Sequence, residues 1–368
     1  MFEPKPKAGL GVHRRSGGRV VHGWRRHSAP FRAVSGFGVT VLLSTVACSG
    51  ATQSTTSDDS GDPLEGKTIE FVVPYEPGGG YDLYVRLMAP FLEKCLGTEV
   101  VPINEPGAGS LRATNQTAAA PGDGTRIQIY NAPGAIAAQI ADIEGAKYDL
   151  KKFSWITRIA PGVDVLSVAA DSEFKDFQDL IDADRPVRFV ATGPGSNEYF
   201  DATVLSNVYG FRADMITGFE GSGEARAAVL KGDADAHIQS LDSALESIEA
   251  GDTRGLVVVD SRPNETVPDV PTVYDYEPVD ESKRDTLDAL VELVKTGRPV
   301  SGPPGLPENV LASLREGFRC VLTNKKFLAK ARENQRPVDP LPGKDTSELV
   351  RKALEPSPAF ARLVSESF

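Results

Sequence analysis

Histidine, cysteine and aromatic side chains are scarce in this 368-residue sequence, which has four histidines, three cysteines and 7% aromatic residues. Three of the histidines lie within the first 27 residues, which leaves only His237 for the rest of the chain and excludes a multi-histidine metal site there. The sequence also lacks the Cys-x-x-Cys, His-Glu-x-x-His and Gly-x-Ser-x-Gly motifs of common zinc proteins and hydrolases. With 40% hydrophobic and 25% charged residues, the composition is that of a soluble globular protein and excludes a disordered, collagen-like or multi-span membrane chain.

Basic residues are concentrated at the N-terminus. Residues 1–48 contain eight of the 40 Lys and Arg residues but only one of the 51 acidic residues. After position 48, 32 basic and 50 acidic residues remain, a net charge of about −18. A protein this acidic repels phosphate backbones, so no binding to nucleic acid is expected.

The first 48 residues have the pattern of an export signal. A basic stretch, residues 14–32, precedes an apolar run at residues 33–47, which is too short for a comfortable membrane span but suits a signal peptide. The run ends at Thr45-Val46-Ala47-Cys48, which resembles the bacterial lipoprotein cleavage box, although that box prefers Leu at the position of Thr45. We therefore expect lipidation of Cys48, with a plain cleaved signal or an uncleaved anchor as alternatives. Residues 49–66, rich in Ser, Thr, Asp and Gly, would then tether an exported protein to the outer face of the cytoplasmic membrane or leave it periplasmic.

Short β-rich runs alternate with helical stretches over the rest of the chain. The clearest helix follows the first strand and has apolar residues at helical spacing: Tyr84, Leu87, Met88, Phe91, Leu92 and Cys95. The predicted strands are residues 69–73, 99–103, 126–130, 165–169, 187–192, 236–240 and 256–259. This alternation predicts an α/β fold with mainly parallel sheets and flanking helices, and about 300 folded residues favour two lobes.

Three glycine-rich turns lie between a predicted strand and a predicted helix, at residues 77–82, 192–197 and 221–224. Glycine lets the backbone approach a ligand closely, and the start of the following helix presents free N–H groups and the positive end of its dipole. Each segment alone could be only a tight turn, with Asp82 as a helix cap. Because ligands of open α/β sheets bind at the carboxyl ends of strands, the three turns together indicate an anion-binding cleft.

Nucleotide and metal cofactors are not expected. Residues 61–68 match the phosphate-binding loop pattern but lead into a predicted strand instead of a helix, and no Gly-x-Gly is completed to Gly-x-Gly-x-x-Gly. His237 lies on a predicted strand, where we expect a buried structural role. Cys95 and Cys320 could form a disulfide in an exported protein, or they could be ordinary buried thiols.

Several motifs, and their order along the chain, resemble those of the solute receptors of tripartite tricarboxylate transporters, a family of bacterial extracytoplasmic binding proteins. The resemblance covers nearly all of residues 67–368. The segments that carry it include Pro77-Gly78-Gly79-Gly80-x-Asp82, Asn104-x-Pro106-Gly107-Ala108-Gly109, Pro121-Gly122-Asp123-Gly124, Val267-Pro268-Asp269-Val270-Pro271-Thr272-Val273 and Pro304-Gly305-Leu306-Pro307.

In such receptors two lobes close like a clamshell on a carboxylated metabolite, which glycine-rich turns hold largely through backbone N–H groups. The resemblance implies lobe 1 at residues 67–167 and 289–368, lobe 2 at residues 168–288, delivery to membrane permease subunits, and no enzymatic activity. The ligand-binding residues that it implies are Pro77, Gly78, Gly79, Gly80, Tyr81, Asp82, Asn131, Ala132, Thr192, Gly193, Gly195, Ser196, Asn197, Gln239 and Ser240. These segments contain no Lys or Arg, so helix dipoles and N–H bonds would neutralise the ligand carboxylate.

The chain departs from the family pattern at three positions in these segments. Tyr81 stands where Thr is common, Gln239 where Asp is frequent, and Glu198 where His often follows the second turn. Glu198 could face solvent; if it faces the cleft, it would discourage a tricarboxylate and favour a ligand with a cationic or hydroxyl group. Residues 280–297 look like an additional charged helix, which we interpret as a solvated surface insertion.

Two other functions remain open from the sequence. A sensory protein would use the same cleft but dock on a membrane kinase instead of a permease. An exported hydrolase or lyase would need a nucleophile in contact with a base, and the best pair that the turns offer is Ser196 with Glu198.

Overall fold

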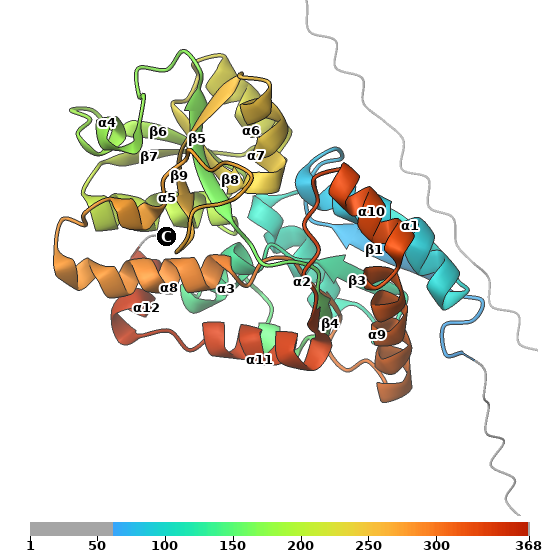
Figure 1. Cartoon of the computed structure of the whole chain (residues 1–368). Coiled ribbons are helices and arrows are strands. Elements are labelled where there is room, and N and C mark those ends of the chain that lie inside the picture. Colours follow the sequence, from blue (N-terminus) through green and yellow to red (C-terminus); the bar gives the residue numbers. More distant parts are fainter. Residues whose placement is uncertain (1–61, 367–368) are drawn as a thin grey trace, which may run out of the picture. The chain divides into compact units, whose positions relative to one another are not determined.

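The computed structural model describes residues 62–366 (Figure 1). The predicted signal peptide at residues 1–48, the predicted lipidation site Cys48 and residues 49–61 of the predicted tether lie outside this range. The tether is shorter than predicted, because residues 62–66 belong to the folded protein. Leu64 is fully buried in a hydrophobic core, and Asp62 accepts a hydrogen bond of 3.0 Å from Ser313.

The first sheet has six strands in the order β11-β4-β10-β3-β1-β2. Their bounds are β1 (Thr68–Val73), β2 (Glu99–Asn104), β3 (Arg126–Ile129), β4 (Ser154–Arg158), β10 (Pro299–Gly302) and β11 (Leu341–Pro342). Strands β2, β1 and β3 are parallel, whereas β10 and β11 are antiparallel to their neighbours.

The second sheet has five strands in the order β7-β6-β8-β5-β9. Their bounds are β5 (Asp164–Ala169), β6 (Val187–Ala191), β7 (Ala213–Thr217), β8 (Ala236–Ser240) and β9 (Thr253–Val259). Strands β7, β6 and β8 are parallel, and β5 is antiparallel to both β8 and β9.

The two-lobed α/β prediction is confirmed, but each sheet is mixed and not mainly parallel. A helical crossover makes successive strands parallel, as between β1, β2 and β3. The chain instead enters β5 directly from the other sheet, through the short link of residues 159–163, and it returns to β10 through residues 260–298. These two strands therefore run antiparallel to their neighbours.

Helices cover both sheets, and Figure 1 shows α1, α9 and α10 beside the first sheet and α6 and α7 beside the second. Their bounds are α1 (Gly80–Leu96), α2 (Leu111–Ala119), α3 (Ala132–Ile140), α4 (Phe177–Ile181), α5 (Asn197–Tyr209), α6 (Ser222–Leu230), α7 (Leu241–Glu249), α8 (Arg284–Val294), α9 (Glu308–Leu322), α10 (Lys325–Glu333), α11 (Gly343–Ala353) and α12 (Pro358–Glu366). Four short 3-10 helices, η1 (Ala108–Ser110), η2 (Leu150–Lys152), η3 (Val273–Asp275) and η4 (Glu281–Lys283), complete the regular structure described for residues 62–366.

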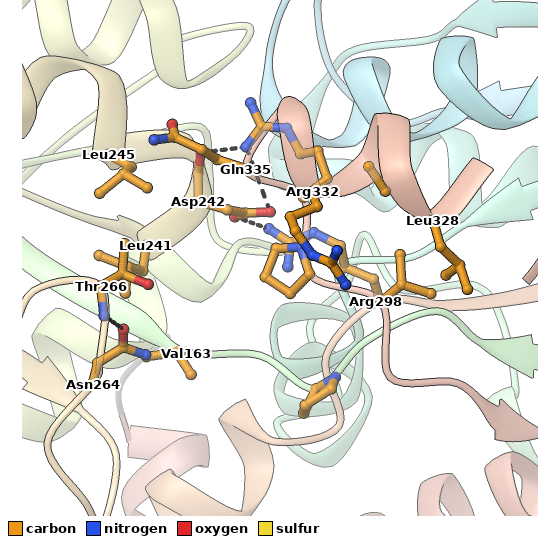
Figure 2. A pocket seen from close by; sticks show the side chains of 15 residues that line it. Val163, Leu241, Asp242, Leu245, Asn264, Thr266, Arg298, Leu328, Arg332 and Gln335 are labelled. Carbon is orange, nitrogen blue, oxygen red and sulfur yellow. Dashed lines mark hydrogen bonds and ion pairs between the residues drawn. The ribbon is translucent and has the colours of Figure 1, made fainter. Parts of the chain in front are cut away.

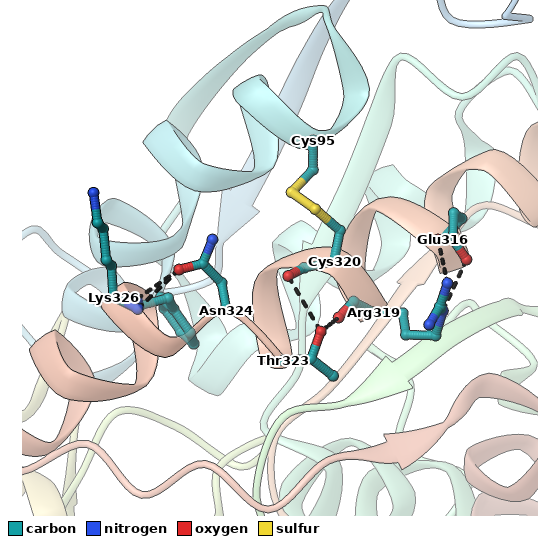
Figure 3. Close-up of a disulfide and its surroundings, with 8 residues drawn as sticks. Cys95, Glu316, Arg319, Cys320, Thr323, Asn324 and Lys326 are labelled. Atoms are coloured by element: carbon teal, nitrogen blue, oxygen red, sulfur yellow. Dashed lines mark hydrogen bonds and ion pairs between the residues drawn. A yellow bond between two sulfur atoms is a disulfide. The ribbon is translucent and has the colours of Figure 1, made fainter.

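Helix α1 buries the apolar stripe that the sequence predicts. Tyr84, Met88 and Leu92 are fully buried against the first sheet. At the edge of the same stripe, Cys95 forms a disulfide with Cys320 of α9, with an S–S distance of 2.05 Å (Figure 3). The structure thus joins the two helices covalently as well as through the core.

Helix α8 is not the solvated insertion that its charges suggest. Leu287, Leu290, Val291 and Val294 are each at most 1% exposed, and α8 packs against α5, α3 and α12. Its charged residues occupy only the opposite face. The helix is therefore part of the largest core, which also includes residues of both sheets.

The predicted lobe limits fall inside regular elements. The limit at residues 167/168 lies within β5, and the limit at 288/289 lies within α8. The chain changes sheet at residues 159–163 and 260–298 instead. The C-terminal helix α12 also leaves the first sheet and packs on α3, α5 and α8.

Candidate functional site

Four helix N-termini surround one small cavity between the two sheets. The helices are α1, which follows β1, and α5, α6 and α7, which follow β6, β7 and β8. The cavity has a volume of about 30 Å³. The residues that line it are Tyr75, Gly79, Gly80, Tyr81, Asn197, Glu198, Ser222, Gln239, Ser240 and Ser243. Helix N-termini present unpaired N–H groups and positive dipole ends, so this arrangement favours an anion.

A second, smaller cavity adjoins the first and shares Tyr81, Asn197 and Ser240 with it. The other residues that line it are Asn131, Pro133, Gly162, Asp164, Val294, Gly297 and Arg298. We call the residues lining these two cavities the interlobe site. They come from both lobes and from both links between the sheets.

Seven of the residues implied by the family resemblance line the interlobe site: Gly79, Gly80, Tyr81, Asn131, Asn197, Gln239 and Ser240. Gly80 approaches the facing lobe closely, because a Cβ there would lie 2.1 Å from Ser243 Oγ. The remaining eight do not line either cavity: Pro77, Gly78, Asp82, Ala132, Thr192, Gly193, Gly195 and Ser196.

Asp82 shapes the first turn from behind. Its Oδ2 accepts hydrogen bonds from the Gly78 N–H (2.8 Å) and from Arg86 Nε (2.7 Å), and its Oδ1 accepts one from Asn104 (2.9 Å). Burial alone would raise the pKa of Asp82, but these hydrogen bonds hold it below its usual value. The residue that caps α1 is Gly79, so Asp82 braces the turn without being the N-cap residue.

The second turn packs directly against the first lobe. A Cβ on Gly195 would lie 2.5 Å from Leu111 Cγ, and a Cβ on Gly193 would lie 2.8 Å from the backbone of Ala108. A Cβ on Gly134 of α3 would lie 2.4 Å from the Gly195 carbonyl oxygen. These glycines permit backbone-to-backbone contact between the lobes, which is a different role from contact with a ligand.

A chain of hydrogen bonds links the lobes across the site. Asn131 Nδ2 donates to the Tyr75 hydroxyl and to Asn197 Oδ1, each at 2.7 Å. Asn197 Nδ2 in turn donates to Asp164 Oδ2 at 2.7 Å. All four side chains are buried.

Asp164 lies beside a second buried carboxyl, that of Asp201. Burial and the neighbouring charge of Asp164 raise the pKa of Asp201 well above its usual value, and burial raises that of Asp164. Among the described residues, no donor reaches either Asp201 oxygen. A protonated Asp201 is the form that such surroundings favour, because an isolated buried carboxylate is costly.

Glu198 faces the cavity and not solvent. It is 6% exposed, and its Oε2 accepts hydrogen bonds from the Thr192 N–H (2.6 Å) and hydroxyl (2.8 Å). Its Oε1 lies 3.2 Å from Nε2 of His237, which is buried as predicted. Glu198 therefore meets the condition under which the sequence favours a cationic or hydroxyl-bearing ligand.

The Ser196–Glu198 pair that an enzyme would need does not form. Ser196 caps α5: its hydroxyl donates to the Gly193 carbonyl (2.8 Å) and accepts from the Tyr199 N–H (3.3 Å). The Glu198 carboxylate is engaged by Thr192 and His237 instead.

Residues 84–354 match the family described as "Tripartite tricarboxylate transporter family receptor", TctC. The chain belongs to this family. A relative, protein BugT of Bordetella pertussis, is 27% identical over 240 residues, which is 64% of this chain and 73% of BugT. The solved structure of periplasmic binding protein BugD has a TM-score of 0.68 at 20% identity and covers 82% of this chain and 98% of its own. MatC from Rhodopseudomonas palustris, solved with bound malate, has a TM-score of 0.68 at 21% identity and covers 82% of this chain and 99% of its own.

Sequence reasoning missed the one cation in the interlobe site of this TctC protein. Arg298 is 3% exposed and forms an ion pair of 2.5 Å with Asp242, and its guanidinium lies 5.0 Å from the centre of the Tyr81 ring. Burial alone would lower the pKa of Arg298, but the nearby charge of Asp242 more than offsets this effect and the pKa is raised. Arg298 therefore stays charged. No local motif marks Arg298 or Asp164, because tertiary packing alone brings them to the glycine-rich turns.

The largest cavity described in this TctC protein lies outside the interlobe site. It has a volume of about 630 Å³ and shares only Arg298 with the interlobe site (Figure 2). It opens between α7 and α10. Over residues 62–366 there is no cluster of His, Cys, Asp or Glu that could hold a metal ion. Within the same range, no helix has the length and apolar character needed to cross a membrane.

Proposed function

We propose that this TctC protein binds a small carboxylated metabolite in the interlobe site and delivers it to a membrane permease. The observation that carries the proposal is the convergence of four helix N-termini on one cavity, with Arg298 beside it. The family description and the structure of MatC with malate support it, as does a second R. palustris structure with adipate, at 22% identity and a TM-score of 0.68.

Ligand entry requires the lobes to separate. A cavity of about 30 Å³ holds about two water molecules, which is less than any metabolite with two carboxylates needs. The two links between the sheets, residues 159–163 and 260–298, are where such a motion would occur. We propose that the ligand binds between separated lobes and is then enclosed.

The charges of the site narrow the ligand class. Arg298 is neutralised by Asp242, so the remaining charge near the cavity comes from Glu198 and the Asp164–Asp201 pair. A second or third carboxylate near Glu198 would be repelled. We therefore propose a ligand that places its carboxylate at the helix N-termini and an ammonium or hydroxyl group toward Glu198.

A thermal-unfolding panel on residues 62–368 tests the proposal. Succinate, malate, aspartate and citrate form a matched set, since succinate, malate and aspartate differ only in one substituent. An acid at 100 times its Kd should stabilise the protein by about 2.7 kcal/mol, a shift of roughly 5 °C. We expect malate or aspartate to exceed succinate and citrate, and Glu198→Gln to reduce that difference. No shift with any small carboxylate at millimolar concentration would refute the proposal.

Gly79 supplies the matched variants. A Cβ at this position would lie 3.5 Å from Ser222 Oγ, an ordinary contact, so Gly79→Ala should fold and still bind. Gly79→Leu would fill the cavity and occupy the space that an enclosed ligand needs, so it should abolish the ligand-induced shift at unchanged unliganded Tm. Equal shifts in both variants would place the ligand elsewhere.

The location proposed for the mature protein is outside the cytoplasmic membrane, anchored by lipid at Cys48. The family implies an extracytoplasmic place, and the anchor depends on the cleavage-box resemblance alone. The intact mass of the protein extracted from membranes tests the anchor. A mass without lipid at Cys48 would contradict it.

A further inference from the structure

We propose that the large cavity between α7 and α10 is a second binding site, for an amphipathic organic anion with one carboxylate and an aliphatic or aromatic body. We call it the α7–α10 cavity. Its volume of about 630 Å³ is in the usual range for small-molecule sites. It shares only Arg298 with the interlobe site, and the proposal does not depend on which metabolite that site takes.

The cavity has apolar residues on two sides. Leu241 and Leu245 of α7 lie on one side, and Leu328 of α10 lies on the other (Figure 2). Val163, Ala331 and Val338 extend the apolar surface. Such a surface would bury a hydrocarbon body of several carbon atoms and gain free energy in proportion to the area covered.

Three arginines supply the positive charge. Arg298, Arg332 and Arg336 all line the cavity, and the only carboxylate among its lining residues is Asp242. Asp242 forms ion pairs with Arg298 (2.5 Å) and Arg336 (3.7 Å), and its carbonyl oxygen accepts a hydrogen bond from Arg336. One carboxylate therefore offsets one of three positive charges.

The guanidinium of Arg332 has no hydrogen bond or ion pair with any described residue, and Figure 2 shows it directed into the cavity. A ligand carboxylate would supply acceptors for this guanidinium in the bidentate geometry that arginine favours.

A ligand in this cavity would contact both lobes. Leu241, Leu245, Asn264 and Thr266 belong to the second lobe, whereas α10 packs on α1 and α9 of the first. Arg298 also lines the interlobe site. An occupant would stabilise one arrangement of the lobes, so its binding should change the affinity of the interlobe site, and the effect should be reciprocal.

Calorimetric titration of residues 62–368 with octanoate tests the proposal. Acetate carries the charge without the tail, and 1-octanol carries the tail without the charge. We expect saturable one-to-one binding of octanoate, with both reference compounds at least tenfold weaker. Comparable binding of 1-octanol, or no octanoate binding at millimolar concentration, would overturn the proposal.

Three variants locate the bound octanoate. Arg332→Gln removes an exposed charge without disturbing a contact and should weaken octanoate binding roughly tenfold. Lys326→Gln on the same helix removes a charge outside the cavity and should leave binding unchanged. Arg332→Lys should restore part of the affinity, and Arg332→Gln should leave the response to malate or aspartate intact.

Gly79→Leu separates the two sites. If octanoate occupies the α7–α10 cavity, this variant should still bind it with wild-type affinity. Loss of octanoate binding in Gly79→Leu, together with unchanged binding in Arg332→Gln, would place octanoate in the interlobe site and refute the second site. That result would leave the proposed receptor function standing.

Discussion

Gly134 provides the sharpest test of whether the contact between the lobes controls ligand affinity. It lies in the first turn of α3, and a Cβ there would be 2.4 Å from the Gly195 carbonyl oxygen and 2.8 Å from the Asn197 nitrogen. Both atoms are backbone atoms of the second lobe and cannot swing away. Gly134→Ala should therefore prevent the observed approach of the two turns.

The magnitude follows from the packing. Forcing a methyl group into a close-packed contact costs about 1–3 kcal/mol, whereas alanine in place of a helical glycine is favourable by up to about 1 kcal/mol. If the cost falls only on the closed arrangement, ligand affinity should drop about 5- to 150-fold. The unliganded Tm should be unchanged or slightly higher, because the separated arrangement gains only the helix preference.

The assay compares Kd by titration calorimetry, using the acid with the largest thermal shift, and unliganded Tm for three proteins. The three proteins are wild type, Gly134→Ala and the control Gly223→Ala. A Cβ on Gly223 would meet only the flexible end of Glu76, at 3.2 Å. Gly134→Ala with wild-type affinity and a lowered Tm would refute the reasoning. It would mean that the contact is a permanent part of the fold and not a step in ligand enclosure.

Two further predictions concern stability. Asp201→Asn should stabilise the protein increasingly as pH rises, because the raised pKa of Asp201 means that the folded state holds a proton which the unfolded chain releases near pH 4. The stability that the protonated Asp201 contributes is complete below that pH and is lost as pH rises through the folded-state pKa. The urea midpoints of variant and wild type should therefore diverge between pH 5, 7 and 9. A constant difference between the midpoints would contradict the assignment. Reducing the Cys95–Cys320 disulfide, which spans 225 residues, should lower the free energy of unfolding by about 2–5 kcal/mol. Urea unfolding of the Cys95→Ser/Cys320→Ser double variant measures it, and wild-type stability in that variant would rule out a stabilising role.

Local sequence patterns predicted most of the first-lobe elements that carry the site. The period of α1 and the glycine-rich turn before it depend on neighbouring residues only, so both follow from the chain itself. Strands β4, β7, β10 and β11 were not predicted. These strands are short, and the sheet that surrounds them does more to determine their conformation than their own residues.

The role of the second turn could not be read locally. Thr192, Gly193, Gly195 and Ser196 have the composition of a ligand-binding turn, yet Gly193 and Gly195 pack against Ala108, Leu111 and α3 of the other lobe. Composition shows that a backbone can be approached closely. It does not show what approaches it.

By itself, the sequence determined the α/β class, the family and the three glycine-rich turns that precede α1, α5 and α6, because these depend on spacing within short segments. Only the tertiary structure decided which side chains meet there. Arg298 and Asp164 reach the interlobe site through the links between the sheets, and Glu198 turns inward because Thr192 and His237 bind its carboxylate. The same holds for α8. Its charged residues suggest a solvated helix, and only the packing against α3, α5 and α12 shows that its other face is buried. Such choices depend on contacts between residues far apart in the chain, which no local pattern encodes.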